Sequence, residues 1–288
     1  MRRILIVGCG DVAMRVAPLL QKNNYRLFGL VRNDARLDQL RAHGIIPVRG
    51  SLDGIKSLGR LSGLADAVLH FAPPPNSGST DTRTRNLLAV LSQGVLPRRF
   101  IYISTSGVYG DCDGAIISET HPLNAQTARA QRRVDAEQQI RIWAKRNQVH
   151  ASILRVPGIY AADRLPLDRL RAGTPTILQE QDSYTNHIHA DDLARIVIAA
   201  LHNSKPNRIY HASDDSELKM GDYFDAVADA YHLPRPPRLP RAEVERAVTP
   251  VLWSFMNESR RLTNTRMKRE LKVELSYPAV ADLLQSKV

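Results

Sequence analysis

Short apolar runs recur along most of the chain, and longer stretches with helical patterning separate them. Runs rich in Val, Ile and Leu are typical of strands buried in a parallel sheet. The expected strands cover residues 3–7, 26–31, 45–48, 67–72, 100–104 and 208–212. Helices are expected over residues 11–21, 81–93 and 220–231. Three further helices are expected to end near residues 43, 146 and 202. Strands that alternate with helices form a right-handed parallel sheet with helices on both faces, which predicts a doubly wound α/β fold.

The first strand breaks into a glycine turn, Gly-Cys-Gly-Asp-Val-Ala, that continues as a helix in which Pro18 is expected to cause a kink or an early stop. A strand followed by G-x-G-x-x-A is the dinucleotide-binding fingerprint of Rossmann-type sheets. The second glycine leaves room for a pyrophosphate at the helix N-terminus, where free N–H groups and the helix dipole favour an anion. The residues predicted to bind the cofactor here are Gly8, Cys9, Gly10, Asp11 and Val12.

The second strand ends on Arg32. An acidic residue at this place, about twenty residues beyond the glycines, would hold the ribose 2′-hydroxyl of NAD. An arginine suits a 2′-phosphate instead, because its planar fork offers two donors and stays charged. A solvated arginine that opens a loop is the alternative interpretation. We predict NADP as the cofactor, with NAD as the alternative.

Ligands of parallel sheets bind at the carboxyl ends of the strands. Residues at or after the ends of the fourth and fifth strands, and after the apolar run at 153–156, are therefore further candidates for cofactor contacts. They are Phe71, Ala72, Pro73, Ser104, Pro157 and Gly158.

The 288 residues leave room for a Rossmann core and a smaller lobe. Two cysteines, Cys9 and Cys112, predict neither a disulfide framework nor a metal site, and they favour a reducing, cytoplasmic location. No apolar segment approaches the roughly twenty residues of a membrane span, so no membrane partner is expected.

A net charge of +11 admits nucleic acid or anionic small molecules as partners. The densest basic stretch, residues 260–272, alternates with apolar residues at helical spacing, and a solvated helix face explains it better than a nucleic-acid patch. We expect a small-molecule substrate, which an anionic compound would suit, and no nucleic-acid partner. A homodimer is left open.

Four spaced segments resemble those of the extended short-chain dehydrogenase/reductase superfamily, which includes nucleotide-sugar epimerases and dehydratases. They are Ser-Thr-Ser-Gly-Val-Tyr-Gly at 104–110, Ser-Glu-Thr-His-Pro-Leu at 118–123, Ile-Leu-Arg-Val-Pro-Gly-Ile-Tyr at 153–160 and Asn-His-Ile-His-Ala-Asp-Asp-Leu-Ala at 186–194. The resemblance implies a Rossmann core of residues 1–160 and 186–213. It also implies a small, mostly helical substrate lobe of residues 161–185 and 214–288.

By this resemblance Thr105 stands where the family's Ser or Thr hydrogen-bonds the reacting oxygen. Arg129 and Arg133 stand where the family has its acid/base Tyr and its Lys. No Tyr lies between Tyr109 and Tyr160, and no Lys lies between residues 56 and 145. The chain thus resembles an atypical member without the Tyr-x-x-x-Lys pair, and Tyr160 is the remaining tyrosine expected to reach the site.

An arginine cannot act as a general acid or base near neutral pH, but it can hold a carboxylate or a phosphate. Arg129 and Arg133 are four residues apart and share one helix face, so they are candidates to bind an anionic substrate. A solvated basic face is the alternative. His189, Asp191 and Asp192 are expected to cap and anchor the helix that follows them.

Two functions stay open. The first is an NADP-linked oxidoreductase, epimerase or dehydratase in which Thr105 polarises the substrate oxygen. The second is a non-catalytic NADP-binding redox sensor or partner-binding module, which the missing Tyr and Lys favour.

Overall fold

The computed structural model describes residues 2–285, and its centre is a parallel sheet of seven strands. The strand order is β11-β7-β5-β4-β1-β2-β3, and every pair is parallel. The strands are β1 (Arg3–Val7), β2 (Arg26–Val31), β3 (Ile45–Arg49), β4 (Ala67–His70), β5 (Arg99–Thr105), β7 (His150–Val156) and β11 (Arg208–His211). The order reverses beside β1, which is the doubly wound Rossmann-type arrangement and confirms the predicted fold class.

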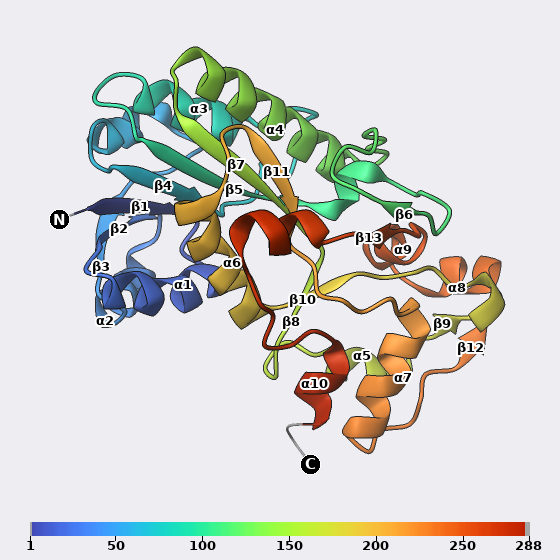
Figure 1. Cartoon of the computed structure of the whole chain (residues 1–288). Helices are drawn as coiled ribbons and strands as arrows, with labels where there is room; N and C mark the ends of the chain where they lie inside the picture. The colour runs from blue at the N-terminus through green and yellow to red at the C-terminus, as the bar shows by residue number, and fades with distance from the viewer. Residues whose placement is uncertain (1, 286–288) are drawn as a thin grey trace.

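Helices cover both faces of the sheet (Figure 1). One face carries α1 (Asp11–Lys22), α2 (Leu37–Ala42) and α6 (Ala190–Asn203), and the other carries α3 (Thr82–Leu91) and α4 (Ala128–Arg146). Successive side chains of a strand point to opposite faces. In β1, Ile4 and Ile6 therefore pack in the core with α1 and α6, whereas Leu5 and Val7 pack in the core with α3 and α4.

Two local predictions differ from the structure. Helix α1 continues through Pro18 to Lys22, and Pro18 lies on the exposed side of the helix. Strand β4 ends at His70 and not at Ala72, because the backbone N–H groups of Phe71 and Ala72 both donate to the carbonyl of Val7 (2.7 and 2.9 Å). This turn of the chain brings residues 71 and 72 against the glycine turn.

Smaller elements gather beyond the carboxyl ends of the central strands (Figure 1). Three pairs of short parallel strands join distant segments: β8 (Gly158–Tyr160) with β10 (His187–His189), β9 (Thr176–Ile177) with β12 (Arg238–Leu239), and β6 (Ile116–Ile117) with β13 (Arg261–Leu262). The helices of this region are α5 (Leu167–Arg171), α7 (Met220–Ala230), α8 (Arg241–Ala247), α9 (Pro250–Met256) and α10 (Val280–Gln285). They pack in small apolar clusters of their own, separate from the two cores of the central sheet.

The basic stretch at 260–272 is not one solvated helix, so that prediction is wrong. Its first part is β13, and a short π-helical turn covers Met267–Leu271. Arg260 donates to the carbonyl of Gly110 (2.6 Å), and Arg266 donates to the carbonyl of Ile209 (3.0 Å). These arginines tie the C-terminal region to the core. Among residues 2–285 no helix is long and apolar enough to cross a membrane.

Candidate functional site

Two adjoining cavities open at the carboxyl ends of the central strands. The larger, of about 750 Å³, follows the glycine turn and the ends of β2 and β4. The smaller, of about 520 Å³, lies between the end of β5 and the C-terminal elements. Ile159 and Arg164 line both cavities, so the two spaces meet at these residues. We call them the glycine-turn cavity and the second cavity.

The two glycines of the turn have different surroundings. Gly8 has a φ of +99°, and a Cβ at this position would lie 2.3 Å from the backbone nitrogen of Ala72. A Cβ on Gly10 would meet nothing within 4 Å. Helix α1 begins after Gly10 without a side-chain cap, so N–H groups of its first turn are available to an anion. The space at Gly10 therefore fits a pyrophosphate, whereas Gly8 is required by the close approach of two chain segments.

The glycine-turn cavity is lined by nine of the residues predicted to bind the cofactor. They are Gly8, Cys9, Gly10, Asp11, Val12, Arg32, Phe71, Ala72 and Pro73. Burial raises the pKa of the Cys9 thiol to about 12, so this cysteine stays a protonated, inert wall residue.

Two arginines flank the end of β2. The side chain of Arg32 is 72% exposed and lies 3.9 Å from Asp53. Arg36, which the sequence analysis missed, donates to the carbonyl of Cys9 (3.2 Å) and lines the same cavity. Asp53 is already held by two hydrogen bonds from Arg83 (2.6 and 2.9 Å), which lower its pKa against the opposing effect of burial. The end of the cavity near β2 is therefore positively charged.

The two arginines of α4 face different cavities. Arg133 lines the glycine-turn cavity and donates to the carbonyl of Ile103 (2.7 Å) and to the hydroxyl of Tyr102 (3.0 Å). Arg129 lines the second cavity, where its guanidinium lies 4.1 Å from the ring centre of Phe255. They do not form one clamp around a single anion. The expected joint clamp is not seen in the structure, because the two side chains line different cavities.

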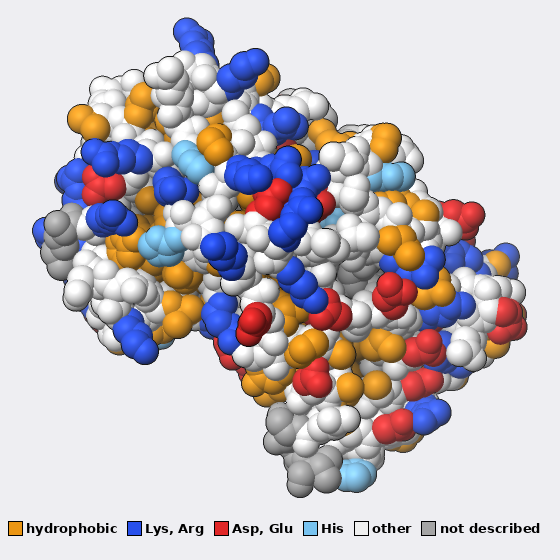
Figure 2. All heavy atoms as spheres, in the orientation of Figure 1, with side chains coloured by type: hydrophobic (Ala, Val, Ile, Leu, Met, Phe, Trp, Pro, Cys, Tyr) orange, Lys and Arg blue, Asp and Glu red, His pale blue; other side chains and the backbone are white. Residues whose placement is uncertain are grey.

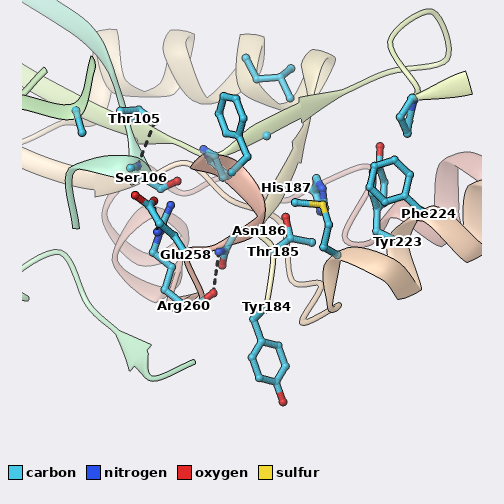
Figure 3. A pocket seen from close by; sticks show the side chains of 18 of the residues that line it. Thr105, Ser106, Tyr184, Thr185, Asn186, His187, Tyr223, Phe224, Glu258 and Arg260 are labelled. Atoms are coloured by element: carbon cyan, nitrogen blue, oxygen red, sulfur yellow. Dashed lines mark hydrogen bonds and ion pairs between the residues drawn. The ribbon is translucent and has the colours of Figure 1, made fainter. Parts of the chain in front are cut away.

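Thr105 lies at the end of β5 and lines the second cavity, where its hydroxyl accepts a bond from the N–H of Gly107 (3.2 Å). Pro157 and Gly158 line this cavity as well, and not the glycine-turn cavity. In Figure 3, Thr105 lies toward the end of the cavity where Glu258 and Arg260 are drawn. These two form an ion pair of 2.8 Å, and both are largely buried.

The opposite end of the second cavity is aromatic, with Arg169 near enough to act on Tyr223. His187 stacks on Tyr223 with ring centres 4.2 Å apart, and Figure 3 shows Phe224 beside them. Burial lowers the pKa of His187 to about 4, so the imidazole is uncharged near neutral pH. Burial also raises the pKa of Tyr223, so its phenol keeps its proton.

Ser104 does not reach either cavity. It is buried and donates to Glu137 (2.5 Å), which pairs with Arg155 (2.6 Å) inside the core. Ser104 and Thr105 follow each other in a strand and point to opposite faces, so only one of them can face the cavity. The prediction that Ser104 contacts the cofactor is corrected on this ground.

Tyr160 also lies outside both cavities. Its side chain is 1% exposed and packs with Leu170, Tyr223 and Phe224, and burial raises its pKa. The pairing of β8 with β10 turns the side chain into this small core. Tyr160 therefore holds the C-terminal region together, and its expected place in the site is corrected.

The segment before α6 caps and anchors that helix through His189 and Asp192. His189 caps the helix by accepting a bond from the N–H of Asp191 (3.2 Å). Asp192 accepts bonds from the N–H groups of Ser276 (3.0 Å) and Tyr277 (2.9 Å), so it anchors the C-terminal segment.

Arg164 connects the loop after β8 to the glycine turn. It donates to Asp11 (2.8 Å), the first residue of α1, and it lines both cavities. Arg15 completes the connection by binding Asp11 (3.1 Å) and Asp163 (3.1 Å).

The model of the NAD dependent epimerase/dehydratase family matches residues 4–212. The chain belongs to this family. A functionally unknown conserved protein from Silicibacter pomeroyi has a similar structure, with 28% identity and a TM-score of 0.81, over 100% of this chain and 98% of that one. No curated protein matches the chain significantly by sequence.

Two enzymes share the fold at lower identity. UDP-glucuronic acid 4-epimerase from Bacillus cereus, in complex with NAD, is 17% identical with a TM-score of 0.78, over 99% of this chain and 95% of that one. DesIV, a dTDP-glucose 4,6-dehydratase from Streptomyces venezuelae with NAD and TYD bound, is 20% identical with a TM-score of 0.79, over 99% of this chain and 95% of that one.

The motifs found in the sequence include the glycine turn and Thr105. Arg36, Arg164 and Glu258 lie outside those motifs, and only the folded chain brings them to the cavities.

Proposed function

We propose that this member of the epimerase/dehydratase family is an NADP-linked enzyme that oxidises or reduces an anionic small molecule. The observation that carries the proposal is the pair Arg32 and Arg36 at the cofactor cavity. The carboxylate that lies near Arg32, Asp53, is paired with Arg83. A 2′-phosphate would gain charge-assisted hydrogen bonds there that a 2′-hydroxyl does not.

The residues present fit such a cofactor along the whole glycine-turn cavity. The free N–H groups after Gly10 would bind the pyrophosphate. By the family resemblance Arg133 stands where the family has its lysine, and its two hydrogen bonds to β5 would orient it toward the nicotinamide ribose. NADP, when bound, supplies the capacity to accept and return a hydride.

The second cavity supplies the groups for the substrate. Thr105 would donate its hydroxyl proton to the reacting oxygen, in a hydrogen bond that polarises that oxygen. Arg129 would hold a carboxylate or phosphate, because stacking on Phe255 leaves its donors free of any carboxylate hydrogen bond among the described residues. Burial lowers the pKa of Arg129, and Glu258 opposes this effect.

Glu258 is our candidate for the proton acceptor that replaces the family's tyrosine. The arginines of the cavity cannot exchange protons near neutral pH and Tyr223 keeps its proton, whereas Glu258 is the carboxylate among the residues that line this cavity. The carboxylate of Glu258 lies at the end of the cavity toward which Thr105 also lies (Figure 3).

The test is turnover. Anionic substrates, including sugar nucleotides with a carboxylate, are incubated with NADP or NADPH, and the absorbance of reduced nicotinamide is followed for the wild type, Thr105→Val and Glu258→Gln. We expect both variants to lose about a hundredfold in kcat while NADPH affinity is retained. Turnover that is equal in all three proteins would contradict the proposed roles, and binding without turnover would favour a redox sensor.

A further inference from the structure

A third cavity lies at the end of the sheet opposite to the two cavities described above. It has a volume of about 610 Å³ and opens at the amino ends of β1, β4, β5 and β7. Because the strands of the central sheet are all parallel, this amino end of the sheet is remote from the carboxyl ends of the strands. The lining residues are Arg2, Arg3, Ile4, Tyr25, Asp66, Ala67, Arg98, Arg99, His150, Leu201 and His202.

The charges around this cavity do not balance. Four arginines face one carboxylate, Asp66. Asp66 is already engaged by Arg3, whose backbone N–H donates to it (2.8 Å) and whose guanidinium lies 3.5 Å away. Within residues 2–285, Arg2, Arg98 and Arg99 form no ion pair. Arginines elsewhere in the chain are commonly paired with acids, as Arg155 is with Glu137.

Arg99 is the most unusual member of this group. Its Nη1 atom is fully buried and has no hydrogen-bond partner in the described structure. A buried guanidinium donor without an acceptor is costly, and most buried polar groups in proteins find a partner. An acceptor that enters the cavity from solvent would satisfy this atom.

The pKa values of two histidines in the lining are lowered in part by the same arginines. Burial lowers the pKa of His150, and Arg99 lowers it further, while Ser204 and Lys205 act in the opposite direction. Burial likewise lowers the pKa of His202, with added effects of Arg2 and Arg99. Figure 2 shows basic and histidine side chains gathered on the side of the molecule where Figure 1 marks the N-terminus.

We propose that this cavity binds a small molecule that carries a phosphate group. Arginine forks match the oxygens of a phosphate, and a doubly charged anion would offset two of the three unpaired guanidinium charges. Tyr25, Leu201 and Ile4 provide an apolar wall for the organic part of the ligand. The recessed donor on Arg99 favours a small anion over a nucleic-acid backbone, which contacts exposed side chains.

The test uses inorganic pyrophosphate as the probe, titrated by calorimetry at moderate salt. Arg99→Gln removes the buried donor, and Arg2→Gln/Arg98→Gln removes two exposed charges whose loss leaves the core intact. We expect each variant to bind pyrophosphate at least about tenfold more weakly than the wild type. The charge-matched control, Arg146→Gln/Arg246→Gln, changes two exposed arginines elsewhere and is expected to bind as the wild type does.

Gly10→Val separates this cavity from the glycine turn, which also fits a pyrophosphate. Pyrophosphate binding that survives in Gly10→Val and is lost in Arg99→Gln and in Arg2→Gln/Arg98→Gln supports the proposal. Binding lost only in Gly10→Val, or reduced equally in the control, overturns it. A short DNA duplex that binds more tightly than pyrophosphate and depends on the same arginines also overturns it.

Discussion

At the scale of single residues, the two glycines of the turn do different work. Gly8 has a positive φ and no room for a side chain, because Ala72 lies against it. Gly10 has open space around it, and that space belongs to the cavity. Gly8 is therefore required by the packing of the fold, whereas Gly10 leaves open space in the cavity.

This difference gives a prediction for two substitutions. Gly10→Val is expected to keep the melting temperature of the free protein and to lose the shift that NADPH produces, since the branched side chain fills the pyrophosphate space. Gly8→Val is expected to destabilise the free protein itself. Circular dichroism melts with and without NADPH measure both effects. A full NADPH shift in Gly10→Val would mean that the glycine turn does not hold the cofactor.

Asp214 sets a pH dependence of stability. It is 4% exposed, and burial raises its pKa from 3.8 to about 7, although hydrogen bonds from Ser216 oppose the shift. The folded protein therefore binds this proton more tightly than the unfolded chain does. The resulting stabilisation is complete below the unfolded pKa of 3.8 and is lost as the pH rises through about 7.

Asp214→Asn removes this titration. The variant is expected to melt several degrees higher than the wild type at about pH 8, with a smaller or reversed difference at about pH 5. The control is Asp38→Asn, which changes a side chain that is 96% exposed. A melting difference that does not vary with pH would exclude Asp214 as the titrating group.

At the scale of elements, helix α4 carries one arginine to each cavity. Arg133→Ala is expected to weaken NADPH binding by about tenfold or more, because its guanidinium lies at the wall of the glycine-turn cavity. Arg129→Ala is expected to leave NADPH affinity within about twofold, because its side chain faces the second cavity. Calorimetric titration of both variants decides the point. Equal losses would show that the two arginines act on one ligand.

The elements also show what the sequence could reveal and what it could not. The strands of the sheet and the glycine turn have local signals, namely apolar runs and a fixed spacing of small residues, and these predictions are confirmed. The stretch at 260–272 has helical spacing, but Arg261 and Leu262 pair with the distant strand β6. Long-range pairing of this kind overrides a local pattern, and no periodicity records it.

The candidate site divides in the same way. The motif alone predicts residues 8–12, and the structure places them at the wall of the glycine-turn cavity. The face to which Ser104 or Thr105 points depends on the register of β5 against its neighbours, and Arg164 reaches Asp11 from a loop of no recognisable pattern. Side chains that meet only through tertiary structure carry no signal in a single sequence.

At the scale of the whole molecule, Asp11, Arg15, Asp163 and Arg164 join the start of α1 to the loop after β8. This network lies where the glycine-turn cavity meets the second cavity, because Arg164 lines both. We propose that the positive end of the glycine-turn cavity, at Arg32 and Arg36, favours NADP over NAD, and this preference is the central claim of our account.

Calorimetric titration with NADPH and NADH tests the proposed cofactor preference most directly, for the wild type and for Arg32→Ala/Arg36→Ala. We expect the wild type to bind NADPH at least about tenfold more tightly than NADH, a difference of about 1.4 kcal/mol. The double variant is expected to bind the two cofactors with similar affinity, mainly through weaker binding of NADPH. Equal affinities in the wild type, or an unchanged preference in the variant, would contradict the account.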